Sequence, residues 1–108
     1  MLVGTIVENS LADKSVLKKL KITSSRQAGD WTLHEVQISE GQVRELGKNF
    51  TNEPWYAHFW EPGKDEIIVV FKDKMFTIRH SDKSTWSGAV AYGKSIGIPD
   101  EQLDFVIP

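Results

Sequence analysis

Cysteine is absent from the 108 residues, so neither disulfide bonds nor thiolate chemistry contributes to this protein. Long hydrophobic runs are absent too, because the longest, "IIVVF" (Ile67–Phe71), falls far short of the roughly 20 residues that a membrane helix needs. The N-terminal "MLVGTIVENS" lacks the basic stretch and apolar core that mark a signal peptide. These absences predict a cytoplasmic protein with no membrane partner.

A basic excess is also missing. The chain has 13 lysines and arginines against 15 aspartates and glutamates, which gives a net charge of −2. Proteins that bind the phosphate backbone of nucleic acids generally carry a strong positive balance. The one basic cluster, Lys14 to Lys21, has Glu8 and Asp13 as neighbours and is interpreted as a solvated face. The charge balance therefore argues against a nucleic-acid partner.

Motifs of known catalytic and metal sites are missing as well. "GKSIG" (Gly93–Gly97) contains a Gly-Lys-Ser triplet, but it falls at the end of an expected helix, where the helix dipole repels anions. His58 and His80 are expected on strands separated by a third strand, roughly 11 Å apart, which is too far to share a zinc ion. We predict no metal site and no cofactor.

The residues that are present fit one domain spanning residues 1–108. Alternating and β-branched stretches predict strands, and Ser10, Ser39 and Asp82 or Ser84 offer helix starts. The resulting order, βαββαβββα, with short loops, predicts an α+β fold with a mostly antiparallel sheet and helices packed on one face. In Trp31–Ile38 the apolar alternation changes phase, which predicts a bulge near His34–Glu35.

The aromatic stretch "PWYAHFWE" (Pro54–Glu61) opens a three-stranded meander whose turns fix which side chains share a face. A four-residue "PGKD" loop pairs Tyr56 with Phe71, His58 with Val69 and Trp60 with Ile67. A two-residue "DK" loop then pairs Phe71 with Phe76, Val69 with Ile78 and Ile67 with His80. One face therefore holds Tyr56, His58, Trp60 and Phe76, and we expect the helices there. The opposite face also has an apolar centre, and we expect the first hairpin, a second subunit or a ligand to cover it.

The stretches "WTLHEVQIS", "PWYAHFW", "IIVVFKDKMF", "KSTW" and "YGKSIGIPDEQLDF" resemble a group of uncharacterised bacterial and archaeal proteins of about this length. The resemblance covers most of the chain, from "IVENSL" to the C-terminus. It implies a whole-chain domain and a prokaryotic origin, and it transfers no functional residue.

For function, the sequence favours a non-catalytic binding domain whose partner is another protein, a second copy in a homodimer, or a small ligand. The expected contacts are Trp55, Tyr56, His58, Arg79 and His34. Trp55 and Tyr56 would supply contact area, Arg79 would meet an anion or carbonyl, and the histidines would be polar handles. The alternative is a small hydrolase, transferase or isomerase in which a strand histidine acts as general base beside a carboxylate.

Overall fold

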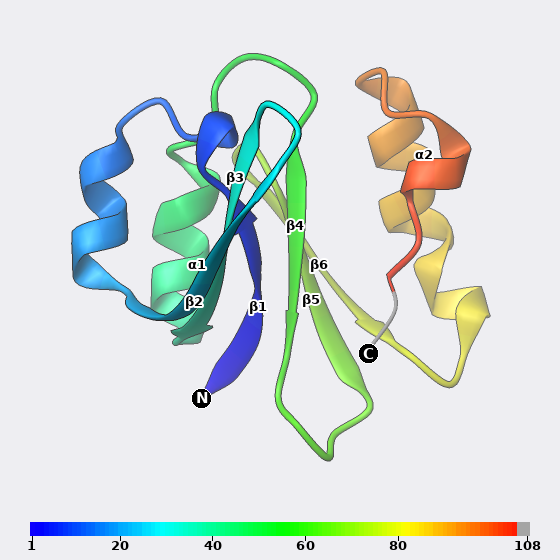
Figure 1. Ribbon diagram of the computed structural model, residues 1–108. Coiled ribbons are helices and arrows are strands. Elements are labelled where there is room, and N and C mark those ends of the chain that lie inside the picture. The colour runs from blue at the N-terminus through cyan, green and yellow to red at the C-terminus, as the bar shows by residue number, and fades with distance from the viewer. Residues whose placement is uncertain (106–108) are drawn as a thin grey trace.

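The protein is built around one six-stranded sheet, whose strands run roughly vertically in Figure 1 with helices on either side. The computed structural model describes residues 1–105. The strand order is β2-β3-β1-β4-β5-β6, and every neighbouring pair is antiparallel. The strands are β1 (Leu2–Val7), β2 (Lys21–Ala28), β3 (Trp31–Ile38), β4 (Tyr56–Trp60), β5 (Glu66–Phe71) and β6 (Lys74–Arg79). The predicted α+β fold with an antiparallel sheet is confirmed.

Two α-helices and four short 3-10 helices complete the fold. They are η1 (Glu8–Ser10), η2 (Lys14–Lys19), α1 (Glu40–Gly47), η3 (Lys83–Trp86), α2 (Ser87–Ser95) and η4 (Asp100–Gln102). The predicted capping box at Ser39 is present, since the Ser39 hydroxyl accepts from the Gln42 backbone N–H at 3.2 Å. The Gln42 side chain in turn accepts from the Ser39 N–H at 2.9 Å. In residues 1–105 no helix is long and apolar enough to cross a membrane.

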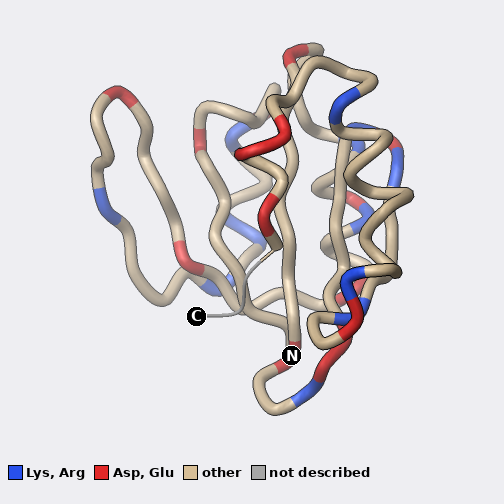
Figure 2. Tube along the Cα trace, turned by 90° about the vertical axis from the view of Figure 1, so that its right-hand side faces the viewer, with Lys and Arg blue, Asp and Glu red and all other residues tan. Residues whose placement is uncertain are grey.

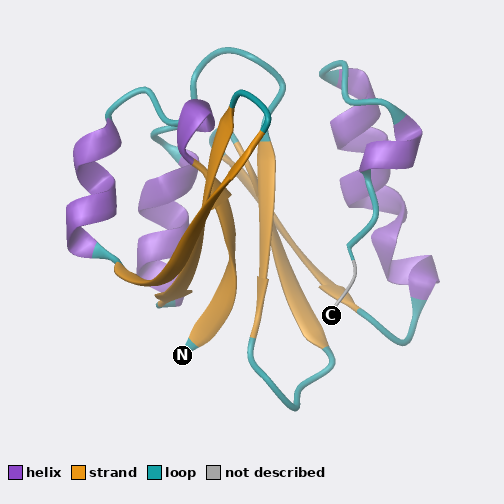
Figure 3. Ribbon diagram, viewed as in Figure 1, coloured by secondary structure: helices purple, strands orange, loops and turns teal. Residues whose placement is uncertain are grey.

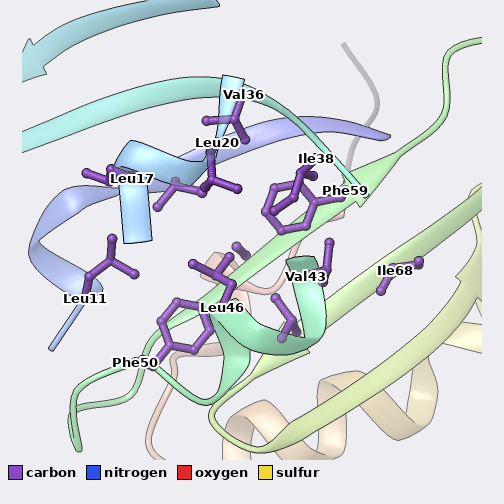
Figure 4. Close-up of a cluster of buried hydrophobic side chains, with 13 residues drawn as sticks. Leu11, Leu17, Leu20, Val36, Ile38, Val43, Leu46, Phe50, Phe59 and Ile68 are labelled. Atoms are coloured by element: carbon purple, nitrogen blue, oxygen red, sulfur yellow. The ribbon is translucent and has the colours of Figure 1, made fainter. Parts of the chain in front are cut away.

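The sheet carries a hydrophobic core on each face, with helices on both sides (Figure 3). The first core joins β1, β3, β4 and β5 to α1 and to the segment around η2, and Figure 4 shows its side chains. Its buried residues are Ile6, Leu11, Leu17, Leu20, Val36, Ile38, Val43, Leu46, Phe50, Ala57, Phe59, Ile68 and Val70. The second core joins β5 and β6 to α2 and the C-terminal segment. Its buried residues are Ile67, Val69, Phe71, Ile78, Trp86, Ala89, Ile98, Leu103 and Phe105.

Helices on both faces are a departure from the expected single helical layer. The reason lies in β5, which is buried from Ile67 to Phe71 and therefore needs apolar cover on each side. The chain supplies that cover itself, with α1 packed against one face and α2 against the other. The first hairpin, β2–β3, does not curl across the meander but extends the same sheet as its outer edge.

The predicted side-chain faces of the meander are confirmed. Tyr56 pairs with Phe71, His58 with Val69 and Trp60 with Ile67, as the "PGKD" loop indicated. The second turn was placed one residue too late, because Lys72 and Asp73 form it and Phe71 pairs with Lys74. Asp73 adopts the left-handed conformation (φ 58°) that a tight turn requires and that aspartate tolerates. The resulting shift of two residues preserves the faces, but it leaves His80 beyond the end of β6.

The prediction of a bulge near His34–Glu35 in β3 is wrong. The irregularity falls between Ile22 and Ser24 of β2, whereas β3 pairs with β1 without interruption. In β3, His34 shares the face of Val36 and Ile38, and Trp31 lies on the other face. The change of apolar phase therefore marks the point at which β3 stops supplying residues to the opposite face and begins to contribute to the first core.

The two halves of the sheet meet at a narrow seam. Only Val3 with Trp60 and Gly4 with Phe59 pair across β1 and β4. A Cβ atom at position 4 would lie 2.5 Å from both the His58 carbonyl oxygen and the Phe59 ring. Glycine is therefore required there so that the Phe59 ring can lie directly over β1.

Candidate functional site

A concavity lies on the face of the second core, where helical cover is incomplete. Val3 pairs with Trp60, so Thr5 and Val7 of β1 share the face of Tyr56, His58 and Trp60. The groove spans β1 and β4 across the seam, with a volume of about 820 Å³. It is lined by Thr5, Val7, Trp31, Glu53, Pro54, Trp55, Tyr56, Ala57, His58, Trp60, Ile98 and Gln102. We call this site the aromatic groove.

Two sets of rings form its walls. Along β4, the His58 ring stacks at 6.5 Å from Tyr56 and at 5.6 Å from Trp60, because every second residue of a strand faces the same side. Near the start of β4, the rings of Trp31 and Trp55 meet edge to face at 5.4 Å. Trp31 is 47% exposed, which is unusual for so large an apolar side chain.

The C-terminal segment closes the groove on one side through Ile98 and Gln102. The Tyr56 hydroxyl donates a hydrogen bond to the Gln102 carbonyl, and the Phe105 ring packs edge-on against Tyr56 at 5.6 Å. Burial raises the pKa of Tyr56, the Asp104 carboxylate raises it further, and a hydrogen bond from the Asp104 backbone opposes them. At neutral pH the hydroxyl therefore stays protonated and fixes this wall to β4.

The electrostatics of the aromatic groove are one-sided. Among the described residues that line it, Glu53 is the only carboxylate, His58 is also ionisable, and there is no lysine or arginine. The segment that contributes Ile98 and Gln102 also carries Asp100, Glu101 and Asp104, all exposed. Figure 2 shows acidic positions along this segment, which leads to the grey C-terminal end. Acidic residues therefore outnumber lysines and arginines in the described lining and along this segment.

The structure brings Trp55, Tyr56 and His58 together in the aromatic groove, but it places the other candidates elsewhere. Arg79 lies on β6, where its Nε is 3.3 Å from Asp65 Oδ2 and its backbone carbonyl accepts from the Trp86 indole at 2.8 Å. Arg79 therefore links the loop between β4 and β5, through Asp65, to η3, through Trp86. Sequence reasoning missed Thr5 and Gln102, because nothing local signals that their distant segments adjoin β4, and it also missed Glu53, which directly precedes β4.

His34 forms a separate cluster on the face of the first core. It is 9% exposed, and its Nε2 lies 2.9 Å from Glu8 Oε1. Its Nδ1 lies 2.7 Å from the hydroxyl of Ser25, which pairs with it across β2 and β3. An ionised carboxylate only accepts, so Nε2 carries a proton, and in the neutral ring Nδ1 then accepts from the Ser25 hydroxyl. The partner is Glu8 and not the adjacent Glu35, which points to the opposite face.

In residues 1–105, no three side chains of histidine, aspartate or glutamate converge to hold a metal ion. No protein-family model, curated protein or solved structure matches the chain.

Proposed function

We propose that this protein is a non-catalytic binding domain that holds a small organic molecule in the aromatic groove. The observation that carries the proposal is the groove itself, whose volume of about 820 Å³ falls in the range of roughly 300–1,000 Å³ of ligand sites. Its lining also has the composition of such sites, with many aromatic side chains and a few polar groups such as Gln102 and Thr5.

The exposed rings supply a driving force for binding. A large apolar surface left in water gains about 25 cal/mol for each Å² that a ligand covers. The walls are held in place before binding, since Tyr56 is tied to the C-terminal segment and Trp31 rests against Trp55. A preformed site loses little conformational entropy when it is filled.

Protein partners and self-association are the competing interpretations. Protein interfaces favour broad patches, whereas this site is concave and adjoins a fixed wall. The free edge strand β2 is interrupted by its bulge at Thr23, a feature that discourages pairing with another chain. These features favour a small ligand over a homodimer. The absence of cysteine supports action in a reducing compartment such as the cytoplasm.

A thermal-shift screen of a metabolite library, followed by tryptophan fluorescence titration, tests the proposal. Ligands that bind only the native state raise its melting temperature. We expect Trp31→Ala to abolish the shift that a hit produces, and Ile22→Ala to leave it unchanged. Ile22 is a matched control, because it is exposed to 39% on the same hairpin but does not line the groove. Equal responses of the two variants would place binding outside the groove and overturn the proposal.

The Ser25–His34–Glu8 cluster favours a second candidate function, a small hydrolase. Glu8 orients the His34 ring, and His34 Nδ1 is placed to take the proton from the Ser25 hydroxyl, which is the arrangement of a nucleophile, its base and an orienting acid. Ser25 Oγ would then bond to the acyl carbon of an ester. The departing alcohol would take the proton from His34, and water would release the acid from Ser25 in the reverse sequence.

A fluorophosphonate probe and a p-nitrophenyl ester test this candidate. We expect labelling of Ser25 and a hydrolysis rate that falls by about 10²-fold or more in Ser25→Ala and Glu8→Gln. Ser24→Ala is the control, since the Ser24 hydroxyl bonds to Glu35 and not to a histidine. An unlabelled Ser25, with the same slow hydrolysis in all variants, would leave His34 a structural residue.

A further inference from the structure

We propose that the ligand of the aromatic groove is a free organic cation of the tertiary or quaternary ammonium class. This inference rests on the binding function proposed above and adds the charge of the ligand. It begins from the pairing of aromatic walls with Glu53, the only carboxylate in the described lining.

Aromatic faces attract cations, and tryptophan does so most strongly. The Trp31 and Trp55 rings are inclined at 65° to each other, so they present faces in two different directions at the mouth of the groove. Trp60 and Tyr56 add rings from β4. A rounded cation in the groove can therefore approach more than one ring at once, as in the aromatic cages that bind methylated ammonium groups.

The acidic residues in and beside the aromatic groove disfavour anionic ligands. An anion would enter a site with no lysine or arginine in its described lining and with Glu53 already present. Asp100, Glu101 and Asp104 extend the negative potential along the adjoining segment, and their influence reaches about 10 Å at 0.1 M salt. Lys94, the last basic residue of the chain, lies 4.0 Å from Asp100 and offsets only part of this charge.

Contacts between a cation and an aromatic ring already occur elsewhere on the face of the second core. The Lys83 ammonium lies 5.2 Å from the centre of the Trp86 ring, and the Lys74 ammonium lies 5.7 Å from that of Phe76. These rings bind cations that the chain itself supplies. Trp31, which is 47% exposed, has no such partner among the described lysines and arginines, so its ring remains available to a ligand.

The apolar lining also distinguishes among cations. A metal ion needs several oxygen ligands, and the described lining offers one carboxylate. A primary ammonium is strongly hydrated and would lose that hydration against Val7, Ala57 and Ile98. An alkylated ammonium ion exposes methyl groups to the rings while its charge remains attracted to Glu53.

Choline and its neutral isostere 3,3-dimethylbutan-1-ol provide the test, because they share a shape and differ in charge. We expect choline, followed by tryptophan fluorescence or amide NMR titration, to bind about tenfold more tightly than the alcohol. Glu53→Gln should reduce choline affinity about fivefold without altering that of the alcohol. Glu66→Gln is the control, since it removes an exposed carboxylate from β5 outside the groove.

Equal affinity of choline and the alcohol, or equal effects of Glu53→Gln and Glu66→Gln, would overturn the cationic ligand. Failure of both compounds to bind would overturn it as well. In each case the binding function is judged separately, from whether Trp31→Ala and Ile22→Ala respond differently to hits of the metabolite screen. A neutral hit whose binding requires Trp31 would support binding in the aromatic groove and contradict a cationic ligand.

Discussion

The two faces of the sheet differ in how they are filled. The first core is mainly aliphatic, with Phe50 and Phe59 among many leucines, isoleucines and valines. On the second face, rings contact one another in a chain that runs from Trp60 through His58 and Phe105 to Trp86. Branched aliphatic side chains interlock without gaps, whereas large rings at a partly covered margin leave a concave surface. The first face thus serves stability, and the second combines stability with an accessible site.

The largest expected contrast between the faces comes from removing one aromatic ring from each. Phe59 is fully buried in the first core, so Phe59→Ala should lower the free energy of unfolding by about 3–5 kcal/mol. Trp31→Ala, at the groove, should change it by only about 1 kcal/mol, because 47% of the residue is exposed and its ring contact is with Trp55. Urea unfolding of both variants measures the difference. Similar losses would mean that Trp31 belongs to the core.

The next contrast concerns the seam between the halves. Gly4→Ala should destabilise the protein by about 1–3 kcal/mol, because the new methyl group meets the backbone of β4 as well as the Phe59 ring. Gly41→Ala is the control, since its Cβ would enter open space in α1 and should stabilise the helix by up to about 1 kcal/mol. An unchanged free energy of unfolding in Gly4→Ala would show that β1 and β4 can move apart without loss of stability.

A smaller contrast separates the helices that cover the two faces. α1 begins with a capping box, whereas the N-terminus of α2 has no side-chain cap. Ser39→Ala should therefore cost about 1 kcal/mol, and Ser87→Ala, in the first turn of α2, should cost less than about 0.5 kcal/mol. Thermal unfolding followed by circular dichroism compares them. Equal melting temperatures would show that the cap does not hold α1 on its face.

The smallest effect is a pH dependence on the side of the second core. The pKa of Asp65 lies below its ordinary value of 3.8, chiefly because the Ser81 hydroxyl and then its backbone N–H donate to the carboxylate. A lowered native pKa adds stability that is complete above the unfolded pKa and is lost as the pH falls through the native one. Asp65→Asn should therefore flatten the loss of stability below about pH 4, measured by urea unfolding. If Asp65→Asn lost stability below about pH 4 as steeply as the unmodified protein, Asp65 would not be the cause of that loss.

Local patterns in the sequence predicted local structure well. "PGKD" gave the register of β4 and β5, and Ser39 with Gln42 gave the start of α1, because a turn or cap depends on neighbouring residues. The helices were assigned to one face because apolar patterns show that a strand needs cover and do not show which segment provides it. The path of the chain between β3 and β4, which contains α1, decides which face α1 covers.

The candidate site followed the same rule. Trp55, Tyr56 and His58 are adjacent in sequence and were selected together. Their neighbours in the groove come from distant segments, so finding them requires the strand order that places β1 beside β4. The partners of His34 were hidden for a similar reason, since Glu8 and Ser25 reach it only through the combined registers of β1, β2 and β3.

The two-pair seam between β1 and β4 has a consequence for folding kinetics. Strands β1 to β3 lie together in sequence, as do β4 to β6, so each half can assemble through short loop closures. The seam joins Gly4 to Phe59 and must close a much longer loop for only two paired positions. We expect this step to come last. The aromatic groove spans the seam, so a nascent chain would form this groove only at the end of folding.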